Sequence, residues 1–199
     1  MYPNDLYALC DRSLLKRFDI DLDGFLSIAQ RFGAKIVQYR NKSDDIEEKK
    51  KDLQYLRKGW KGILIVNDEL ALASLCDGVH IGQEDLDRLM VSFGIQSKNE
   101  ALSIIKKLYG AKIVGLSTHT LQEIREANEL DLEYVGLGAY RSSTTKDVQY
   151  VLGERLSDIA LRSKHKVVAI GGIRLFEPIE NVWLRAIGSD LLIKGLTFA

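Results

Sequence analysis

Two carboxylates follow neighbouring strands predicted from the sequence, and their placement predicts a metal site. Asp68 comes soon after the apolar stretch Ile63–Val66, and Asp85 follows the apolar stretch Gly78–Ile81. A helical run over Glu69–Leu75 separates the stretches, so the chain returns to the same edge of a parallel sheet and both carboxylates reach one rim. Paired carboxylates, completed by water and phosphate oxygens, suit Mg²⁺. The alternative is that each aspartate caps the helix after it.

Cationic and amide side chains end the neighbouring strands, where they suit an anionic substrate. Arg40 and Lys42 follow the predicted strand Ala34–Gln38. The alternation of an extended chain points these two cations the same way, as two donors to one phosphate need. Taken alone, such a pair is more often a surface feature, and a single histidine is more often structural than catalytic. The other polar side chains at strand ends are Gln38, Asn67, His80, Gln83, Ser117 and His119.

Hydroxyl groups and glycines in the second half of the sequence predict a second anion site. In the loop Gly138–Asp147, hydroxyls stand beside Lys146, and glycines before and within the loop let the backbone turn sharply. Glycines also follow the last two predicted strands, where barrels commonly hold a phosphate on backbone N–H groups. A polar surface loop and a tight turn are the alternatives. The residues concerned are Gly136, Gly138, Ser142, Ser143, Thr144, Thr145, Gly171, Gly172, Lys194 and Gly195.

These residues can act together only in a fold that brings the carboxyl ends of the strands to one rim. The apolar segments predict such a fold, an α/β protein with the (β/α)₈ (TIM) barrel architecture. Residues 1–199 are expected to form a single domain. The chain ends shortly after the last predicted strand, so we expect the eighth helix to be short or missing. An open doubly wound sheet is the alternative, but no dinucleotide-binding fingerprint supports it. The strands are predicted at Leu6–Cys10, Ala34–Gln38, Ile63–Val66, Gly78–Ile81, Lys112–Leu116, Glu133–Leu137, Lys166–Ile170 and Asp190–Lys194.

Apolar residues at helical spacing predict the helices that cover these strands. Ser43 is predicted to cap the second of them, and a polar break near Gly94–Asn99 divides the segment after Leu86. The main helical segments are predicted at Ile20–Arg31, Ser43–Lys58, Glu69–Leu75, Leu121–Asn128 and Tyr150–Ser163, with a short one from Glu177.

The composition excludes several classes of protein. Lys and Arg number 28 and Asp and Glu number 28, so no overall positive field attracts nucleic acid. No apolar run reaches the length of a membrane span, and the first residues lack the pattern of a signal peptide, so we expect a cytoplasmic protein. Cys10 and Cys76 have no metal-ligand spacing and are expected to be buried free thiols. Small phosphorylated molecules are the expected partners, and a homodimer is left open.

Six ordered segments resemble the thiamine-phosphate synthase family (thiamine-phosphate pyrophosphorylases), which includes the related thiazole tautomerases. The segments are QYRNK, LIVNDELALA, DGVHIGQED, GLSTHT, YVGLG with STTKD, and VVAIGGI. The resemblance runs from about Leu6 to Gly195, and six motifs in order are far more specific than any one. It implies a Mg²⁺-dependent barrel enzyme that joins 4-amino-5-hydroxymethyl-2-methylpyrimidine diphosphate to thiazole phosphate. Diphosphate leaves first, and the thiazole nitrogen captures the resulting pyrimidine methyl cation.

The same resemblance implies a role for each matching position. Asp68 and Asp85 are similar to Mg²⁺ ligands, and Ser117 to a residue beside the breaking bond. The expected diphosphate contacts are Arg40, Lys42, Asn67 and Lys146, of which Arg40 and Lys146 would act in catalysis with Ser117. Gln38 and His80 would line the pyrimidine pocket. The residues similar to a thiazole-phosphate site are Ser143, Thr145, Gly172, Lys194 and Gly195.

The chain departs from the family pattern at several points, and two other functions stay open. The segment Val91–Asn99 looks inserted, and Ser142 stands where the family has proline. A thiazole tautomerase would use His119 for proton transfer and would need no metal, so retention of Asp68 and Asp85 argues against it. A non-catalytic protein that binds phosphorylated ligands is the third interpretation.

Overall fold

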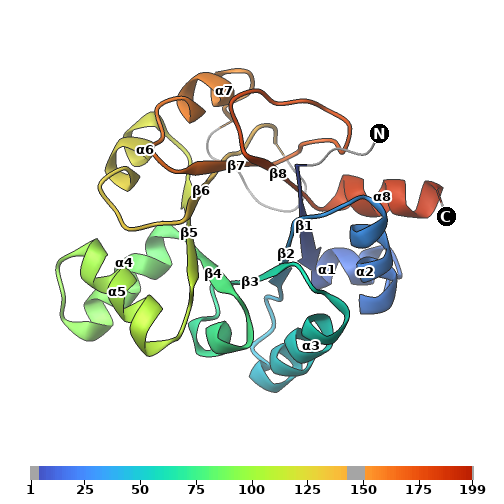
Figure 1. Ribbon diagram of the computed structural model, residues 1–199, viewed down its shortest axis with the longest axis horizontal. Helices are drawn as coiled ribbons and strands as arrows, with labels where there is room; N and C mark the ends of the chain where they lie inside the picture. Colours follow the sequence, from blue (N-terminus) through green and yellow to red (C-terminus); the bar gives the residue numbers. More distant parts are fainter. Residues whose placement is uncertain (1–4, 143–150, 199) are drawn as a thin grey trace.

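The computed structural model describes residues 5–142 and 151–198 and shows a closed barrel of eight parallel strands surrounded by helices (Figure 1). Each strand pairs with the next along the chain, and β1 pairs with β8 to close the ring. The predicted barrel is therefore confirmed. The strands are β1 Leu6–Asp11, β2 Ile36–Arg40, β3 Ile63–Asn67, β4 Gly78–Ile81, β5 Ile113–Thr118, β6 Tyr134–Leu137, β7 Lys166–Ile170 and β8 Leu184–Ile187.

The helices lie outside the strands, and local capping explains where several of them begin. Asp45 accepts a hydrogen bond from the Glu48 amide and caps α3, so the prediction of Ser43 as the cap was wrong. Asp11 caps α1, a short helix that the sequence analysis missed. The helices are α1 Arg12–Arg17, α2 Leu22–Arg31, α3 Ile46–Gly59, the 3₁₀ helix η1 Leu70–Leu75, α4 Gln83–Phe93, α5 Lys98–Leu108, α6 Leu121–Ala127, α7 Arg155–Ala160 and α8 Ser189–Thr197.

The eighth strand and the eighth helix differ from the prediction. The expected strand Asp190–Lys194 lies inside α8, and the true β8 comes earlier, at Leu184–Ile187. No helix begins at Glu177. The eighth helix is therefore present and short, with 9 residues. It packs beside α2, near the elements that open the chain (Figure 1).

The strands alternate between two apolar layers, which explains why they read as almost continuous apolar runs. Outward-facing side chains pack under the helices, whereas a smaller cluster that includes Tyr7, Ile65 and Tyr134 fills the barrel interior. A Cβ atom on Gly115 would lie 2.1 Å from the Tyr134 ring, and one on Gly136 would lie 2.9 Å from the His80 ring. Gly136 thus makes room inside the barrel and does not form the sharp turn expected from the sequence.

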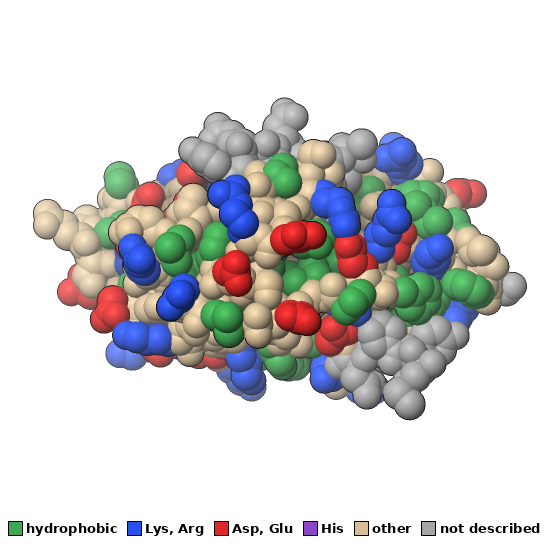
Figure 2. Space-filling model, turned by 90° about the horizontal axis from the view of Figure 1, so that it is seen from above, with side chains coloured by type: hydrophobic (Ala, Val, Ile, Leu, Met, Phe, Trp, Pro, Cys, Tyr) green, Lys and Arg blue, Asp and Glu red, His purple; other side chains and the backbone are tan. Residues whose placement is uncertain are grey.

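The segment Val91–Asn99 forms the connection between two helices. Gly94, at a φ of 64°, ends α4, and Ser97 caps α5 through the Glu100 amide. Of the two cysteines, both free, Cys10 is buried as expected but Cys76 is only half-buried. Among the helices of residues 5–142 and 151–198, none has the length and apolar character needed to cross a membrane. Figure 2 shows a face on which basic and acidic side chains are intermixed, in line with the balanced composition.

Candidate active site

The carboxylates of Asp68 and Asp85 come together at Gly82, between the end of β3 and the start of α4. The Gly82 amide donates a hydrogen bond to the Asp68 carboxylate. A Cβ atom on Gly82 would lie 3.0 Å from Asp85 Oδ2. Asp85 lies in the first turn of α4 and also pairs with Arg88. The 3₁₀ helix η1 begins without a side-chain cap, and Asp85 lies inside α4, whose N-cap is Gly82, so neither aspartate has the alternative capping role.

Electrostatic coupling between the two carboxylates favours a cation. Burial of its carboxylate, followed by the charge of Asp85, raises the pKa of Asp68 to about 6, although Arg40 opposes the shift. A cation near both groups would relieve this repulsion. Among residues 5–142 and 151–198, no group of three or more His, Cys, Asp or Glu side chains could hold a metal. Two carboxylates are a ligand set that suits Mg²⁺ when water and substrate phosphates complete it, and the Mg²⁺ assignment stays a prediction.

Arg40 is held beside this pair by Asp11, a residue that the sequence analysis did not assign to the site. The Arg40 guanidinium donates to Asp11 Oδ2, and the Asp11 Oδ1 atom accepts from the amides of Ser13 and Leu14 in α1. Burial by itself would raise the pKa of Asp11, but the hydrogen bonds from Ser13 and Arg40 and the Arg40 charge outweigh it and lower that pKa. The capped helix α1 thereby fixes a cation at the end of β2.

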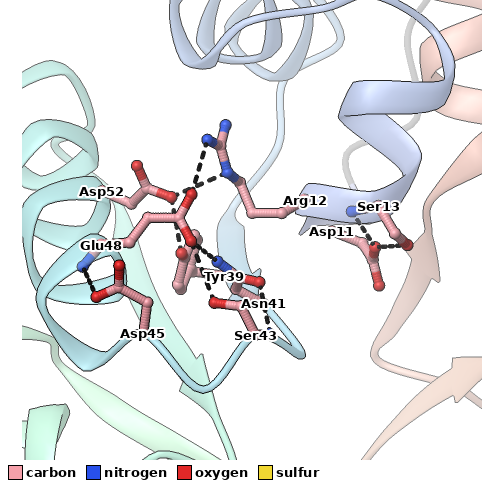
Figure 3. Close-up of polar contacts among 9 residues, drawn as sticks. All are labelled: Asp11, Arg12, Ser13, Tyr39, Asn41, Ser43, Asp45, Glu48 and Asp52. Atoms are coloured by element: carbon pink, nitrogen blue, oxygen red, sulfur yellow. Dashed lines mark hydrogen bonds and ion pairs between the residues drawn. The ribbon is translucent and has the colours of Figure 1, made fainter.

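A second polar cluster fixes the loop that carries Lys42 (Figure 3). Arg12 reaches from α1 to Asp52 on α3, with 3.0 Å between Nε and Oδ2, and the Tyr39 hydroxyl donates to the same oxygen at 2.7 Å. Asn41 and Ser43 both donate to Glu48 Oε2 at 3.1 Å. Lys42 is exposed and lines an open groove of about 1020 Å³ that also touches α2 and α8.

Lys42 and Arg40 thus have different surroundings, because Arg40 does not line that groove. Their expected joint contact with one phosphate stays a prediction.

A chain of hydrogen bonds crosses the barrel interior and joins six strands. Its first half runs from Ser117 on β5 through His80 and Tyr134 to Tyr7, with contacts of 2.9, 3.0 and 2.9 Å. Its second half runs through the side chains of Gln38, Asn67 and Asp68. Four of the predicted site residues therefore belong to one network that ends at a predicted metal ligand.

The predicted thiazole-phosphate side is only partly described. Gly171 and Gly172 follow β7 with φ angles of 96° and 66°, a left-handed backbone conformation that favours glycine and agrees with a tight turn. Ser143, Thr145 and Lys146 lie outside the described residues.

Lys194 and Gly195 do not end a strand, so placing them at this rim was wrong. They lie in the last turns of α8, where Gly195 packs against Ile28 of α2. The residues that follow β8 are Gly188 and Ser189, and α8 begins there without a side-chain cap. Backbone N–H groups at that helix start are therefore the better candidates for this rim.

His119, the residue required by the isomerase alternative, pairs within its own segment. Its backbone amide and its Nδ1 atom lie 2.7 and 3.2 Å from Oε2 of Glu123, in the first turn of α6. The side chain is not part of the hydrogen-bonded chain described above. Tyr7, Tyr134, Asp11 and Gly82 were missed by the sequence analysis. Asp11 had a signal there as a polar residue directly after a predicted strand, and Gly82 and Tyr134 stand in the segments DGVHIGQED and YVGLG, but none of them was assigned a role.

Comparisons with known proteins identify a family. A family model described as thiamine monophosphate synthase matches residues 6–187. Thiamine-phosphate synthase of Persephonella marina is 33% identical over 177 residues, covering 84% of this chain and 76% of that protein. The enzyme of the same name from Clostridium acetobutylicum is 36% identical over 175 residues, covering 84% and 75%.

A solved structure supports the fold. Thiamine phosphate pyrophosphorylase from Pyrococcus furiosus superimposes with a TM-score of 0.67 at 21% identity, and the match covers 98% of this chain and 96% of that one.

Proposed function

This chain belongs to the thiamine monophosphate synthase family, and we propose that it is a thiamine-phosphate synthase, a transferase. It joins 4-amino-5-hydroxymethyl-2-methylpyrimidine diphosphate to thiazole phosphate and releases diphosphate. The observation that carries the mechanism is the meeting of Asp68 and Asp85 at Gly82 beside Arg40, because it combines a cation site with a fixed positive charge. This pattern suits a diphosphate leaving group.

We infer that the carboxylate pair holds Mg²⁺ together with the substrate. When bound there, the metal ion would supply positive charge to the departing diphosphate. Arg40 adds a second positive charge, and its contact with Asp11 keeps the guanidinium in place before the substrate arrives. Asn67, which already donates to Asp68, would orient the diphosphate at the same point.

The remaining residues orient the organic parts of the substrates. Gln38 and His80 are buried in the barrel wall and fixed by hydrogen bonds on both sides of their polar groups. They would hold the pyrimidine ring beside Ser117, while the turn at Gly171 and Gly172 would receive the thiazole phosphate. Fixed charges and proximity then promote ionisation and capture without a covalent intermediate on the protein.

The experiment is a coupling assay on the purified chain with both substrates, with and without Mg²⁺. We expect diphosphate release that depends on Mg²⁺ and on the thiazole phosphate. Conversion of a thiazole carboxylate phosphate without metal would instead identify an isomerase, and binding without turnover would identify a non-catalytic protein.

Substitution of Asp85 tests the metal assignment. Asp85→Ala should lower kcat at least a hundredfold and raise the Mg²⁺ concentration required, because the cation loses one of its two protein ligands. Asp87→Ala is the matched control, since Asp87 is exposed on the same helix. An Asp85→Ala rate equal to that of the control would contradict the metal assignment.

A further inference from the structure

The hydrogen-bonded chain inside the barrel has a direction, which follows from its two amide side chains. An amide nitrogen only donates and an amide oxygen only accepts, and the Asn67 amide nitrogen donates to Asp68 Oδ2. Asn67 Oδ1 in turn accepts from Gln38 Nε2 at 3.0 Å, and Gln38 Oε1 accepts from the Tyr7 hydroxyl at 2.6 Å. Each amide in this half is thus fixed with its oxygen towards Tyr7 and its nitrogen towards Asp68.

The two tyrosines pass this direction on to His80. A phenol hydroxyl has one proton, and Tyr7 donates its proton to Gln38. In the hydrogen bond of 2.9 Å between the two hydroxyls, Tyr134 must therefore be the donor and Tyr7 the acceptor. Tyr134 then has no proton left for His80 Nδ1, which lies 3.0 Å away. The imidazole must therefore donate this hydrogen bond, from Nδ1 to the Tyr134 hydroxyl oxygen. Burial raises the pKa of both phenols, which keeps their protons in place.

We propose that Tyr134 and Tyr7 are positioning residues that fix the His80 proton on Nδ1 and thereby make Ser117 a hydrogen-bond acceptor towards the substrate. On a neutral imidazole the Nε2 atom then carries a lone pair, and Ser117 Oγ donates its only proton to it across 2.9 Å. Ser117 is half-buried and retains lone pairs for a ligand.

This arrangement determines which pyrimidine is accepted, an inference that rests on the proposed function. An acceptor at Ser117 matches the N–H of an aminopyrimidine, whereas a 4-oxo analogue would bring a carbonyl oxygen against the serine lone pairs. Sites built on buried hydrogen bonds discriminate strongly, because the wrong ligand leaves groups unpaired. The rings are also held firmly, since Gly115 and Gly136 leave space for only the Tyr134 and His80 rings.

The tautomer can be read directly by nitrogen NMR of the histidines in the full chain, without turnover. The chain has 3 histidines, so a His80→Gln variant assigns the signals. We expect Nδ1–H in the wild type and a shift towards Nε2–H in Tyr134→Phe. Tyr7→Phe should cause a similar shift although Tyr7 does not touch His80, because Tyr134 is then free to donate. Tyr39→Phe, which removes a tyrosine hydrogen bond outside the barrel, should leave the signals unchanged.

A kinetic comparison tests the consequence. The ratio of kcat/KM for the amino substrate over its 4-oxo analogue should fall about tenfold in Tyr134→Phe, the effect of one buried hydrogen bond, and stay constant in Tyr39→Phe. A wild-type His80 with its proton on Nε2, or an unchanged tautomer in Tyr134→Phe, would overturn the inference. If the tautomer is as expected but no coupling occurs, the proposed function fails and the positioning role remains.

Discussion

The ion pair between Asp11 and Arg40 gives a pH dependence at the scale of single residues. The pKa of Asp11 is lower in the folded protein than in the unfolded chain, so the pair stabilises the fold above the unfolded pKa of about 4. This contribution is lost as the pH falls through the lower, folded pKa. Asp11→Asn keeps a helix-capping side chain but removes the charge, and should cost about 1–2 kcal/mol of unfolding free energy at pH 7.

Chemical denaturation at pH 7 and near pH 3 measures this difference. The wild type and Asp11→Asn should differ at pH 7 and converge at the lower pH. Asp21→Asn is the control, because Asp21 caps α2 but has no ion pair within residues 5–142 and 151–198. A gap between the wild type and Asp11→Asn that grows as the pH falls would contradict the assignment.

Gly82 leads to a second prediction at this scale. Its φ of −79° suits any residue, but a Cβ atom would meet Asp85 Oδ2 at 3.0 Å. Gly82→Ala should therefore displace the Asp85 carboxylate and weaken Mg²⁺ binding about tenfold, while unfolding changes by less than about 1 kcal/mol. Calorimetric titration of Mg²⁺ in the presence of diphosphate measures the effect. An unchanged affinity for Mg²⁺ would show that Gly82 is not part of the metal site.

The sequence reveals charged site residues more readily than buried aromatic ones. Asp68 and Asp85 stand out because a carboxylate within a few residues of the end of an apolar strand has few uses in a core. Tyr7 and Tyr134 lie within strands, where an aromatic side chain looks like ordinary packing. Their shared hydrogen bond joins two residues that are 127 positions apart in the sequence, and no local pattern can reveal such a contact.

At the scale of elements, strand β8 shows why the eighth unit was misplaced. Arg185 interrupts the apolar pattern of this strand, yet its side chain is only 2% exposed. Its burial is possible because Asp5 and backbone carbonyls of the β7–β8 loop accept hydrogen bonds from the guanidinium. The following segment, Asp190–Lys194, is more apolar and was read as the strand. Helix and strand are hard to distinguish in such short apolar runs. By contrast, β4 and β7 were predicted with their observed bounds.

The packing of α8 on α2 tests the corrected position of Gly195. A Cβ atom there would lie 2.5 Å from Ile28 Cδ1. Gly195→Ala should lower the unfolding free energy by about 1 kcal/mol, because overpacking exceeds the gain in helix propensity. Adding Ile28→Val should recover part of this loss. The KM for thiazole phosphate should not change in either variant, and a tenfold rise with unaltered stability would return Gly195 to the phosphate site.

At the scale of the whole molecule, the barrel is closed by contacts between its two ends. Strand β1 pairs with β8, and Asp5 accepts two hydrogen bonds of 2.7 Å from the Arg185 guanidinium across that seam. Hydrogen bonds from Arg185 to the Leu175 and Glu177 carbonyls tie the β7–β8 loop to the same point. Opening the seam would leave these groups unpaired, so it should occur only together with unfolding of the rest of the barrel.

The two tryptophans allow this cooperativity to be measured, because Trp60 lies at the end of α3 and Trp183 directly before β8. Variants that retain one tryptophan each, Trp60→Phe and Trp183→Phe, should give a fluorescence transition that coincides with loss of far-ultraviolet circular dichroism, as expected for one domain. Arg185→Leu should lower the unfolding free energy by about 1–3 kcal/mol, because the loop carbonyls and the partly exposed Asp5 lose their hydrogen bonds, and should keep the transitions coincident. If Trp183 in this variant reports an earlier transition than Trp60, the seam opens independently and the barrel does not unfold as one cooperative unit.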